Sequence, residues 1–273
     1  MKKYLLMALK VIMYMGILYV INQFALFLFF NVWSKDPGFK KFIDQNVPLV
    51  IIAMFALTVL VYALIFRLQK KSLLKTCNFS KYKLKSAVCG SLMAAFGAIG
   101  LLGIVSLSYI KTSFPVLEWY INTFYNCPSP LVFVILMLVI IPVLEEMIFR
   151  GTVFNELKDK MPLAIAIILQ AVIYGIVQFN IPVGVFAVIC SIIYCIPYAW
   201  TGSLWASITV QIVGAMVMLA VRRTELIKMM GKLGDPGLIV ISVIAALCLT
   251  GSIYLLRKSE FGKTPKNTPE ITA

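Results

Sequence analysis

Residues 134–154 read VILMLVIIPVLEEMIFRGTVF, and this stretch decides the class of protein. Every residue before the acids is apolar, and about 20 apolar residues span the hydrocarbon core of a bilayer. The run ends in two adjacent acids, Glu145 and Glu146, and Arg150 comes four residues after the second acid. A carboxylate at membrane depth is energetically costly, so such a residue is a candidate for function. The stretch therefore predicts a membrane-spanning helix that ends in a functional site.

The composition of the whole chain agrees with this interpretation. Hydrophobic residues make up 61% of the 273 residues and charged residues 13%, which is typical of a polytopic membrane protein and excludes soluble, disordered and small disulfide-rich classes. The six cysteines are scattered without metal-ligand or redox spacing, so we interpret them as buried apolar residues. The chain contains no histidine, which excludes Ser-His-Asp hydrolysis and His-ligated zinc. We expect no metal and no cofactor.

Eight apolar runs are long enough to span a membrane, so we expect an all-α polytopic membrane protein. The runs cover residues 11–33, 47–66, 87–110, 130–149, 163–180, 182–200, 203–221 and 237–256. They divide the chain into three N-terminal helices (1–110), a core of four helices (111–222), a last transmembrane helix (223–258) and a polar tail predicted to be disordered (259–273). The first run has no small-residue cleavage site, so we expect it to remain as an anchor.

Basic residues predict how the chain is oriented in the membrane. The loop from Arg67 to Lys85 is rich in lysine and contains no acid, so it is predicted to be cytoplasmic. With eight spans, both termini are then cytoplasmic, and we expect a bacterial plasma membrane. Residues 222–236 disagree, because they are basic yet would lie outside, so a helix between 163 and 221 could be miscounted. The net charge of +14 predicts contact with anionic lipid and not with nucleic acid.

The acids and Arg150 are spaced so that one pair can form within a helix. Glu146 and Arg150 are four residues apart and can pair, whereas Glu145 points about 100° away and is left available for another partner. The alternative is that both acids mark a helix end at the lipid headgroups, paired to Arg150 and to basic loops.

A Glu-Glu-x-x-x-Arg sequence at the end of an apolar helix resembles the first motif of the CPBP intramembrane proteases. That family includes the Ras-converting CAAX endopeptidases and the Abi bacteriocin-immunity proteins. Its second and third motifs each contain a histidine, and the best matches here are YGIVQ (Tyr174 to Gln178) and QIVGA (Gln211 to Ala215), after the segment Gly202 to Ala206. The resemblance covers residues 115–222. It implies that Glu145, Glu146 and Arg150 are the retained catalytic motif, and that Tyr174, Gln178, Gln211 and Ala215 line a cavity.

Both motif histidines are glutamine here, and an alanine replaces the Asn or Asp of the third motif. In the family, as the resemblance implies, a Glu activates water while the histidines position it and stabilise the oxyanion. An amide can donate and accept hydrogen bonds but cannot transfer a proton near neutral pH. The alternative interpretation is that Gln178 and Gln211 are ordinary interhelical hydrogen-bonding residues.

Residues on neighbouring antiparallel helices can contact each other only if they lie at the same depth in the membrane. Glu145 and Gln178 lie almost equally far from the loop between their helices, so we expect them at one depth. We also expect a polar cavity that receives Arg150, Asn155 and Glu156.

Three functions remain open at this point. The first is a pseudoprotease that binds or regulates a membrane partner, a protein or peptide, as a regulator, scaffold or immunity factor. The second is a slow but active endopeptidase that depends on Glu145 or Glu146. The third is a transporter whose acids bind protons or cations, although we find no broken helices in two matching halves.

Overall fold

The computed structural model describes residues 2–32, 35–45, 47–125 and 131–262. The structure is 88% helical and has no strand among the described residues, so the predicted all-α fold class is confirmed. The long helices are α1 (Lys2–Asn31), α3 (Val47–Leu68), α5 (Leu84–Val105), α8 (Leu131–Ile148), α11 (Ile181–Thr201), α12 (Leu204–Arg223) and α14 (Gly234–Phe261). The shorter ones are α2 (Pro37–Gln45), α4 (Leu73–Cys77), α6 (Ser108–Ser113), α7 (Pro115–Tyr125), α9 (Asn155–Lys158), α10 (Leu163–Ile176) and α13 (Leu226–Lys232), and a π-helical turn, η2 (Phe149–Phe154), joins α8 to α9.

Six helices among the described residues are long and apolar enough to cross a membrane. They are Lys2–Leu28, Leu49–Leu68, Leu84–Val105, Ile181–Thr201, Leu204–Arg223 and Gly234–Phe261. The predicted run 130–149 corresponds to α8, and 163–180 corresponds to α10, an apolar helix of only 14 residues. The helix α14 continues to Phe261, into the predicted tail, and residues 263–273 lie outside the described part.

The helix α10 ends before the predicted run does, because a turn comes after it. Phe179 has a φ of 50°, in the left-handed region, which an α-helix cannot contain. Asn180 then caps α11 by accepting a hydrogen bond from the backbone N–H of Val183 (3.2 Å). Helices α10 and α11 are therefore separate helices, and the segment between 163 and 223 forms α10, α11 and α12, of which α11 and α12 are long enough to span a membrane.

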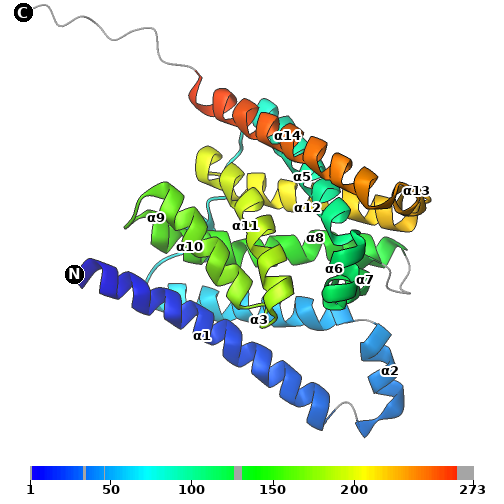
Figure 1. Cartoon of the computed structure of the whole chain (residues 1–273). Coiled ribbons are helices and arrows are strands. Elements are labelled where there is room, and N and C mark those ends of the chain that lie inside the picture. The colour runs from blue at the N-terminus through cyan, green and yellow to red at the C-terminus, as the bar shows by residue number, and fades with distance from the viewer. Residues whose placement is uncertain (1, 33–34, 46, 126–130, 263–273) are drawn as a thin grey trace, which may run out of the picture.

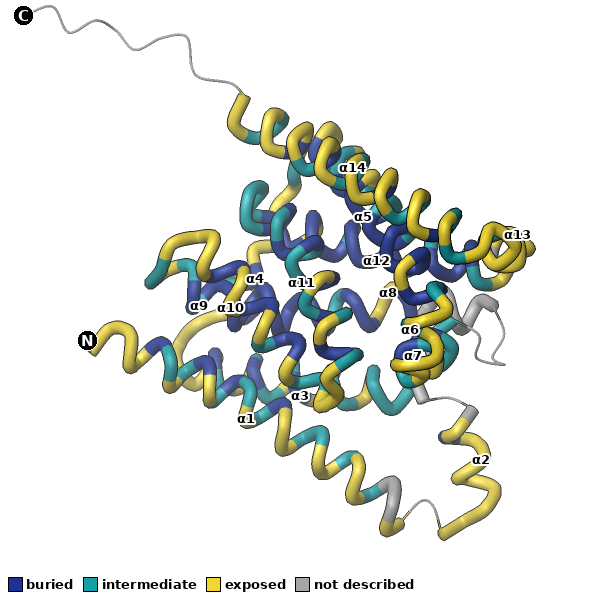
Figure 2. Tube along the Cα trace, in the orientation of Figure 1, coloured by how far each residue is buried: buried dark blue, intermediate teal, exposed yellow. Residues whose placement is uncertain are grey.

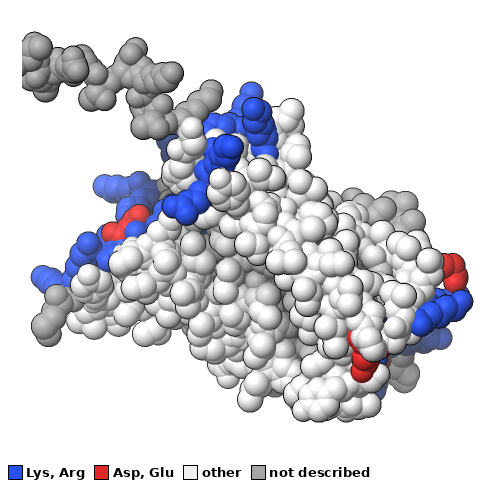
Figure 3. Space-filling model, turned by 45° about the horizontal axis from the view of Figure 1, so that its top comes forward, with Lys and Arg blue, Asp and Glu red and all other residues white. Residues whose placement is uncertain are grey.

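The first residues of α1 and the last residues of α14 lie on the same side of the molecule (Figure 1, left). This placement agrees with an even number of passes. On the face that Figure 3 shows, Lys and Arg gather at the two ends of the molecule, and a broad uncharged belt separates them. A belt of this kind is what a lipid-facing surface requires.

The buried residues concentrate in the central helices, while α1 and α14 keep long exposed faces (Figure 2). Helices α10 and α11 cross closely at two glycines. A Cβ on Gly175 would lie 2.8 Å from the carbonyl oxygen of Gly184, and a Cβ on Gly184 would meet the Gly175 oxygen at the same distance. Small residues of this kind allow membrane helices to pack with their backbones close together. The crossing places α10 against the helix that carries Ser191.

The turn η2 is entirely buried and extends the path of α8 into α9. Its Gly151 is packed against α4, because a Cβ there would collide with the Cys77 sulfur. Burial also raises the pKa of the Cys77 thiol to about 12, so this cysteine is an unreactive packing residue. A π-helical turn contains more residues than an α-helical turn. The residues of α8 therefore lie at a different depth and rotation relative to α9 than they would in one continuous α-helix.

Candidate functional site

The carboxylate of Glu145 is held by two side chains from two other helices. The Tyr174 hydroxyl on α10 donates to Glu145 Oε1 at 2.7 Å, and Gln211 Nε2 on α12 donates to Glu145 Oε2 at 2.5 Å. Glu145 is 7% exposed, so these donors replace water around it. Helices α8, α10 and α12 therefore meet at one carboxylate.

The carboxylate of Glu146 points to a different group of partners. Arg150 Nη1 lies 2.9 Å from Glu146 Oε1, and both side chains are completely buried. The Ser207 hydroxyl of α12 contacts the other carboxylate oxygen of Glu146. The i,i+4 spacing thus forms the pair that it predicts, and the pair lies inside the protein rather than at lipid headgroups.

Arg150 continues this chain of contacts into α11 and α10. Its Nη2 donates to both the backbone oxygen and the hydroxyl of Ser191, each at 2.9 Å, and the Ser191 hydroxyl donates to Gln170 Oε1 at 3.2 Å. The guanidinium carbon also lies 5.3 Å from the centre of the Tyr174 ring. Arg150 therefore links Glu146 of α8 to α10 and α11, while its Nε is buried without a hydrogen-bond partner among the described residues.

The structure places the other two sequence-predicted residues away from Glu145. Gln178 lies beyond the end of α10, half-buried, and its amide donates to the backbone oxygen of Tyr174 at 3.3 Å. Ala215 is buried in an apolar cluster with Leu138 and Leu219. Of the candidate cavity residues, Tyr174 and Gln211 contact the acid, whereas Gln178 and Ala215 make contacts elsewhere.

The equal-depth expectation led us to expect Gln178 beside Glu145, and the structure shows no contact between them. The contact with Glu145 comes instead from Tyr174, one helical turn before Gln178. The π-helical turn η2 interrupts the α-helix between Glu145 and the loop, so the distance along the chain is a poor guide to depth there.

Sequence reasoning missed Ser207, Ser191 and Gln170. A signal was present for two of them, because Gln170 precedes Tyr174 by four residues and Ser207 precedes Gln211 by four. Polar residues repeated at i,i+4 in an apolar helix share one face. Ser191 gives a weaker signal, because the residues that follow it on the same face of α11, Tyr194 and Tyr198, are aromatic and also common in apolar helices.

The beginning of α12 is fixed by the loop after α4. Asn78 Nδ2 donates to the Gly202 oxygen at 2.6 Å, and the Leu204 N–H donates to the Asn78 oxygen at 3.0 Å. Gly202 has a φ of 71°, a left-handed conformation that glycine adopts easily. This clamp sets the register of α12, and with it the positions of Ser207 and Gln211.

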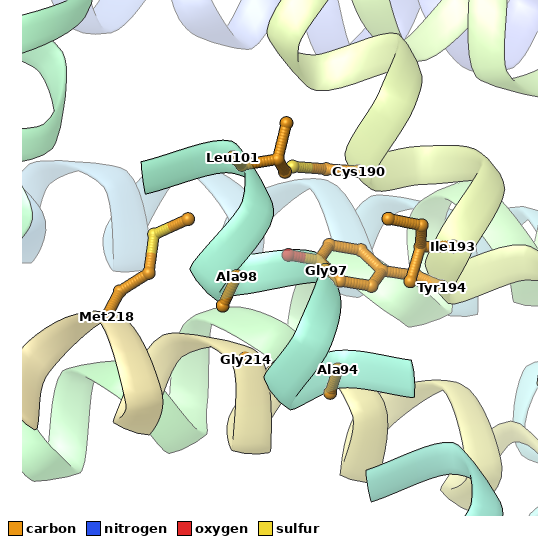
Figure 4. A pocket seen from close by; sticks show the side chains of 9 residues that line it. All are labelled: Ala94, Gly97, Ala98, Leu101, Cys190, Ile193, Tyr194, Gly214 and Met218. Atoms are coloured by element: carbon orange, nitrogen blue, oxygen red, sulfur yellow. The ribbon is translucent and has the colours of Figure 1, made fainter. Parts of the chain in front are cut away.

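The polar residues that we expected to face water bind protein groups instead. Asn155 donates to the backbone oxygens of Thr76 and Gly151, both at 2.9 Å, and Glu156 pairs with Lys10 at 2.7 Å. A cavity of about 10 Å³, room for about one water, lies between α5, α11 and α12. The hydroxyl end of Tyr194 points toward α5 there (Figure 4), and neither Glu145 nor Glu146 lines the space. The site is closed in this structure.

The basic segment after α12, which disagrees with the predicted orientation, is partly neutralised. Both nitrogens of the Arg222 fork contact the Glu118 carboxylate of α7, at 2.6 and 2.9 Å. This hydrogen-bonded arginine holds the pKa of Glu118 below its usual value. Because Glu118 offsets the charge of Arg222, the net positive charge at the end of α12 is smaller in the folded protein than the count of basic residues in 222–236 suggests.

Together, the apolar helices and the buried carboxylates describe a multi-pass membrane protein with a pair of glutamates buried among its helices. Residues 127–217, which include Glu145, Arg150, Tyr174 and Gln211, match the sequence model of the family described as type II CAAX prenyl endopeptidase Rce1-like. This match, which covers about a third of the chain, confirms the resemblance to the CPBP family found in the motifs. Among curated proteins and among solved structures, nothing matches the chain.

Proposed function

We propose that this protein is a catalytically impaired CPBP pseudoprotease, which uses its inherited site to bind or regulate a membrane partner. The observation that carries the proposal is the pair of hydrogen bonds to Glu145, from Tyr174 and from Gln211. Each carboxylate oxygen accepts a hydrogen bond from a protein donor, and because Glu145 is only 7% exposed, little of the carboxylate remains open to a water. A general base needs one of these oxygens within hydrogen-bond reach of the attacking water.

The remaining groups of the site do not supply the missing chemistry. Gln211 provides an amide where the resemblance expects an imidazole, and an amide neither takes nor gives a proton near neutral pH. The chain has no histidine that could move into the role. Arg150 is paired with Glu146, donates to Ser191 and is completely buried, so it does not face a space where an oxyanion could form. Losing groups of this kind typically lowers a rate by about 10²- to 10⁴-fold each.

The second candidate function is a slow endopeptidase, and one observation favours it. The Oε1 atom of Gln211 is buried and has no hydrogen-bond partner among the described residues. If Tyr174 moved away, a water could be held between Gln211 Oε1 and Glu145. Because the amide transfers no proton, Glu145 would then act as the only proton acceptor.

The two candidates differ in whether any cleavage depends on Glu145. We suggest reconstituting the wild type, Glu145→Gln and Glu156→Gln in proteoliposomes with a fluorogenic farnesylated peptide that ends in a CAAX sequence. Glu156→Gln is the matched control, because Glu156 is a partly exposed acid paired with Lys10, away from Glu145. The pseudoprotease proposal expects equal, background signal from all three. Cleavage by the wild type and Glu156→Gln that is lost in Glu145→Gln would overturn it.

Binding is tested separately, by photocrosslinking in cells from a probe amino acid placed at Gln178. The proposal expects a membrane-protein adduct that decreases in Gln211→Leu and persists in Glu156→Gln. Equal adducts in both variants would show that the partner does not depend on the Glu145 site. A variant with Gln178→His, Gln211→His and Ala215→Asn restores the family's motif residues and serves as the test of whether the fold can still support cleavage.

A further inference from the structure

A second cavity lies far from the carboxylate site, between α1, α2 and α3. Its volume is about 260 Å³. The lining residues are all apolar: Ile21, Phe24, Ala25 and Leu28 of α1, Ile43 of α2, and Leu49, Val50, Ala53, Met54 and Leu57 of α3. We call this space the α1–α3 groove.

The groove exists because α1 and α3 are joined at one end only. Near the start of α1, the Tyr62 hydroxyl donates to the Tyr14 oxygen at 2.5 Å, and their rings lie 5.2 Å apart. Tyr14 also stacks against Phe66. From there the two helices diverge, and α2 lies across the open end of the wedge (Figure 1). The aromatic contact is the apex, and the groove occupies the wider part.

The helix α2 has the character of a helix that lies in the membrane interface. Phe39, Phe42 and Ile43 share one face, while Lys40 and Lys41 lie on the other side. Asp36 caps its start, because its carboxylate accepts a hydrogen bond from the Phe39 N–H at 2.9 Å. Ile43 is buried against the groove, so the basic side chains lie within one helical turn of the groove's end.

The walls of the groove determine what can fill it. Both α1 and α3 are membrane-spanning helices, and rim residues Phe24 and Leu57 are exposed, so the surroundings of the groove are lipid tails. An apolar space next to hydrocarbon gains dispersion contacts when a chain enters it. A charged or polar ligand would find no hydrogen-bond partner among these lining residues.

The length of the groove suits a lipid tail. From Leu49 to Leu57 it runs for about 12 Å along α3, close to the depth of one leaflet, which is about half of a 30 Å hydrocarbon core.

We infer that the α1–α3 groove binds one acyl chain of a phospholipid, whose phosphate lies against Lys40 and Lys41 of α2. The lysines supply the charge complementary to the phosphate, and the exposed Asp36 and Asp44 on the same segment limit the net attraction. The segment 35–45 keeps a net positive charge, because Lys35, Lys40 and Lys41 outnumber the two aspartates. This site is independent of Glu145 and of the proposed function.

Two variants separate groove binding from ordinary contact with bulk lipid. In Ala25→Phe with Ala53→Phe, two phenyl rings occupy the groove from opposite walls. The matched control is Leu247→Phe on α14, which changes an exposed, lipid-facing residue elsewhere. Far-UV circular dichroism checks that each protein keeps its helix content, and Ala53→Leu alone is a milder filling variant.

The measurement is native mass spectrometry of the full chain in detergent with added palmitoyl-oleoyl phosphatidylglycerol or phosphatidylcholine. We expect one tightly retained lipid on the wild type and on Leu247→Phe, and its loss from the filled variant. Lys40→Gln with Lys41→Gln should lower the preference for phosphatidylglycerol by about 25-fold, since each basic residue near the headgroups contributes about 5-fold. Equal lipid retention by filled and control variants would overturn the inference, and so would a dimer that disappears on filling.

A measurement on the wild type alone does not depend on how the variants fold. A phospholipid with a photoreactive tail is incorporated in nanodiscs with the protein, and labelled peptides are mapped after illumination. The inference expects labels concentrated on residues 21–28 and 49–57. Labels spread evenly over α1, α3 and α14 would indicate surface lipid only and would overturn it.

Discussion

Gln211 Nε2 lies 2.5 Å from Glu145 Oε2, although the two residues are 66 positions apart in the chain. The same glutamine has its other amide atom, Oε1, buried without a partner among the described residues. One atom of the side chain therefore serves the acid, and the other remains an unused acceptor. Gln211 therefore contributes to the stability of the fold through its bond to Glu145, and to the site through the acceptor that remains open.

Removing the amide of Gln211 should destabilise the protein more than removing that of Gln178. Gln211→Leu leaves a buried carboxylate oxygen without its donor, which costs about 1 to 3 kcal/mol. Gln178→Leu is the matched control, because that amide is half-buried and bonds only to a backbone oxygen. Thermal unfolding in detergent measures both. Equal shifts of the two midpoints would contradict the placement of Gln211.

Removing the Arg150 side chain should lower the stability of the protein more than removing the Gln211 amide. Arg150→Ala leaves the fully buried Glu146 unpaired, and breaking a buried pair costs about 3 to 5 kcal/mol. The control is Lys228→Ala, which breaks the exposed pair with Glu225 and should cost under about 1 kcal/mol. Arg150→Met combined with Glu146→Leu should recover part of the loss. An unchanged midpoint in Arg150→Ala would place the pair in contact with water.

The contact between Glu118 and Arg222 should make stability depend on pH. Because Arg222 lowers the pKa of Glu118 in the folded protein, the pair stabilises the fold above the ordinary Glu pKa. This contribution is lost as the pH falls from about 4.5 through the lowered pKa. We expect the unfolding midpoint of the wild type to decrease more steeply in this range than that of Glu118→Gln. Glu225→Gln, in an exposed pair, controls for general acid effects, and parallel curves for wild type and Glu118→Gln would reject the prediction.

Cysteine labelling on intact cells tests the predicted orientation. Lys71→Cys in the loop after α3 should be protected from an impermeant maleimide, whereas Lys41→Cys in α2 should react. Both lysines are exposed, so burial does not bias the comparison. The unmodified chain gives the background of its own cysteines. The reverse pattern would place α2 and the α1–α3 groove at the cytoplasmic side.

The fold could be predicted from the sequence where length and hydropathy alone decide it. The long apolar runs became helices because a lipid environment leaves the backbone no other way to satisfy its hydrogen bonds. The short helices α2, α6, α7 and α13 were not predicted, since they are brief and their sequences carry no apolar run of spanning length. The end of α10 was placed four residues too late, because the apolar Val177 and Phe179 extend the hydropathy signal through the turn.

The site could be predicted from the sequence only as far as local helix geometry reaches. The pairing of Glu146 with Arg150 is a consequence of spacing along one helix. Tyr174 and Gln211 were candidates through the resemblance, but their contact with Glu145 depends on how three helices are placed in depth. The turn η2 alters that depth, and neither its position nor its type is encoded in the periodicity of the apolar residues.

The turn η2 also has a consequence for how this segment tolerates changes of length. A π-helical turn holds one residue more than an α-helical turn. This extra residue rotates α8 by about 100° relative to α9, compared with a continuous α-helix. On the α8 side, Glu146 faces Ser207; on the α9 side, Asn155 accepts a hydrogen bond from Tyr198 at 2.8 Å. Deleting a single residue within 149–154 would leave only one of these two faces in register. The length of this segment is therefore fixed, because loss of one residue would separate the acid from its neighbours.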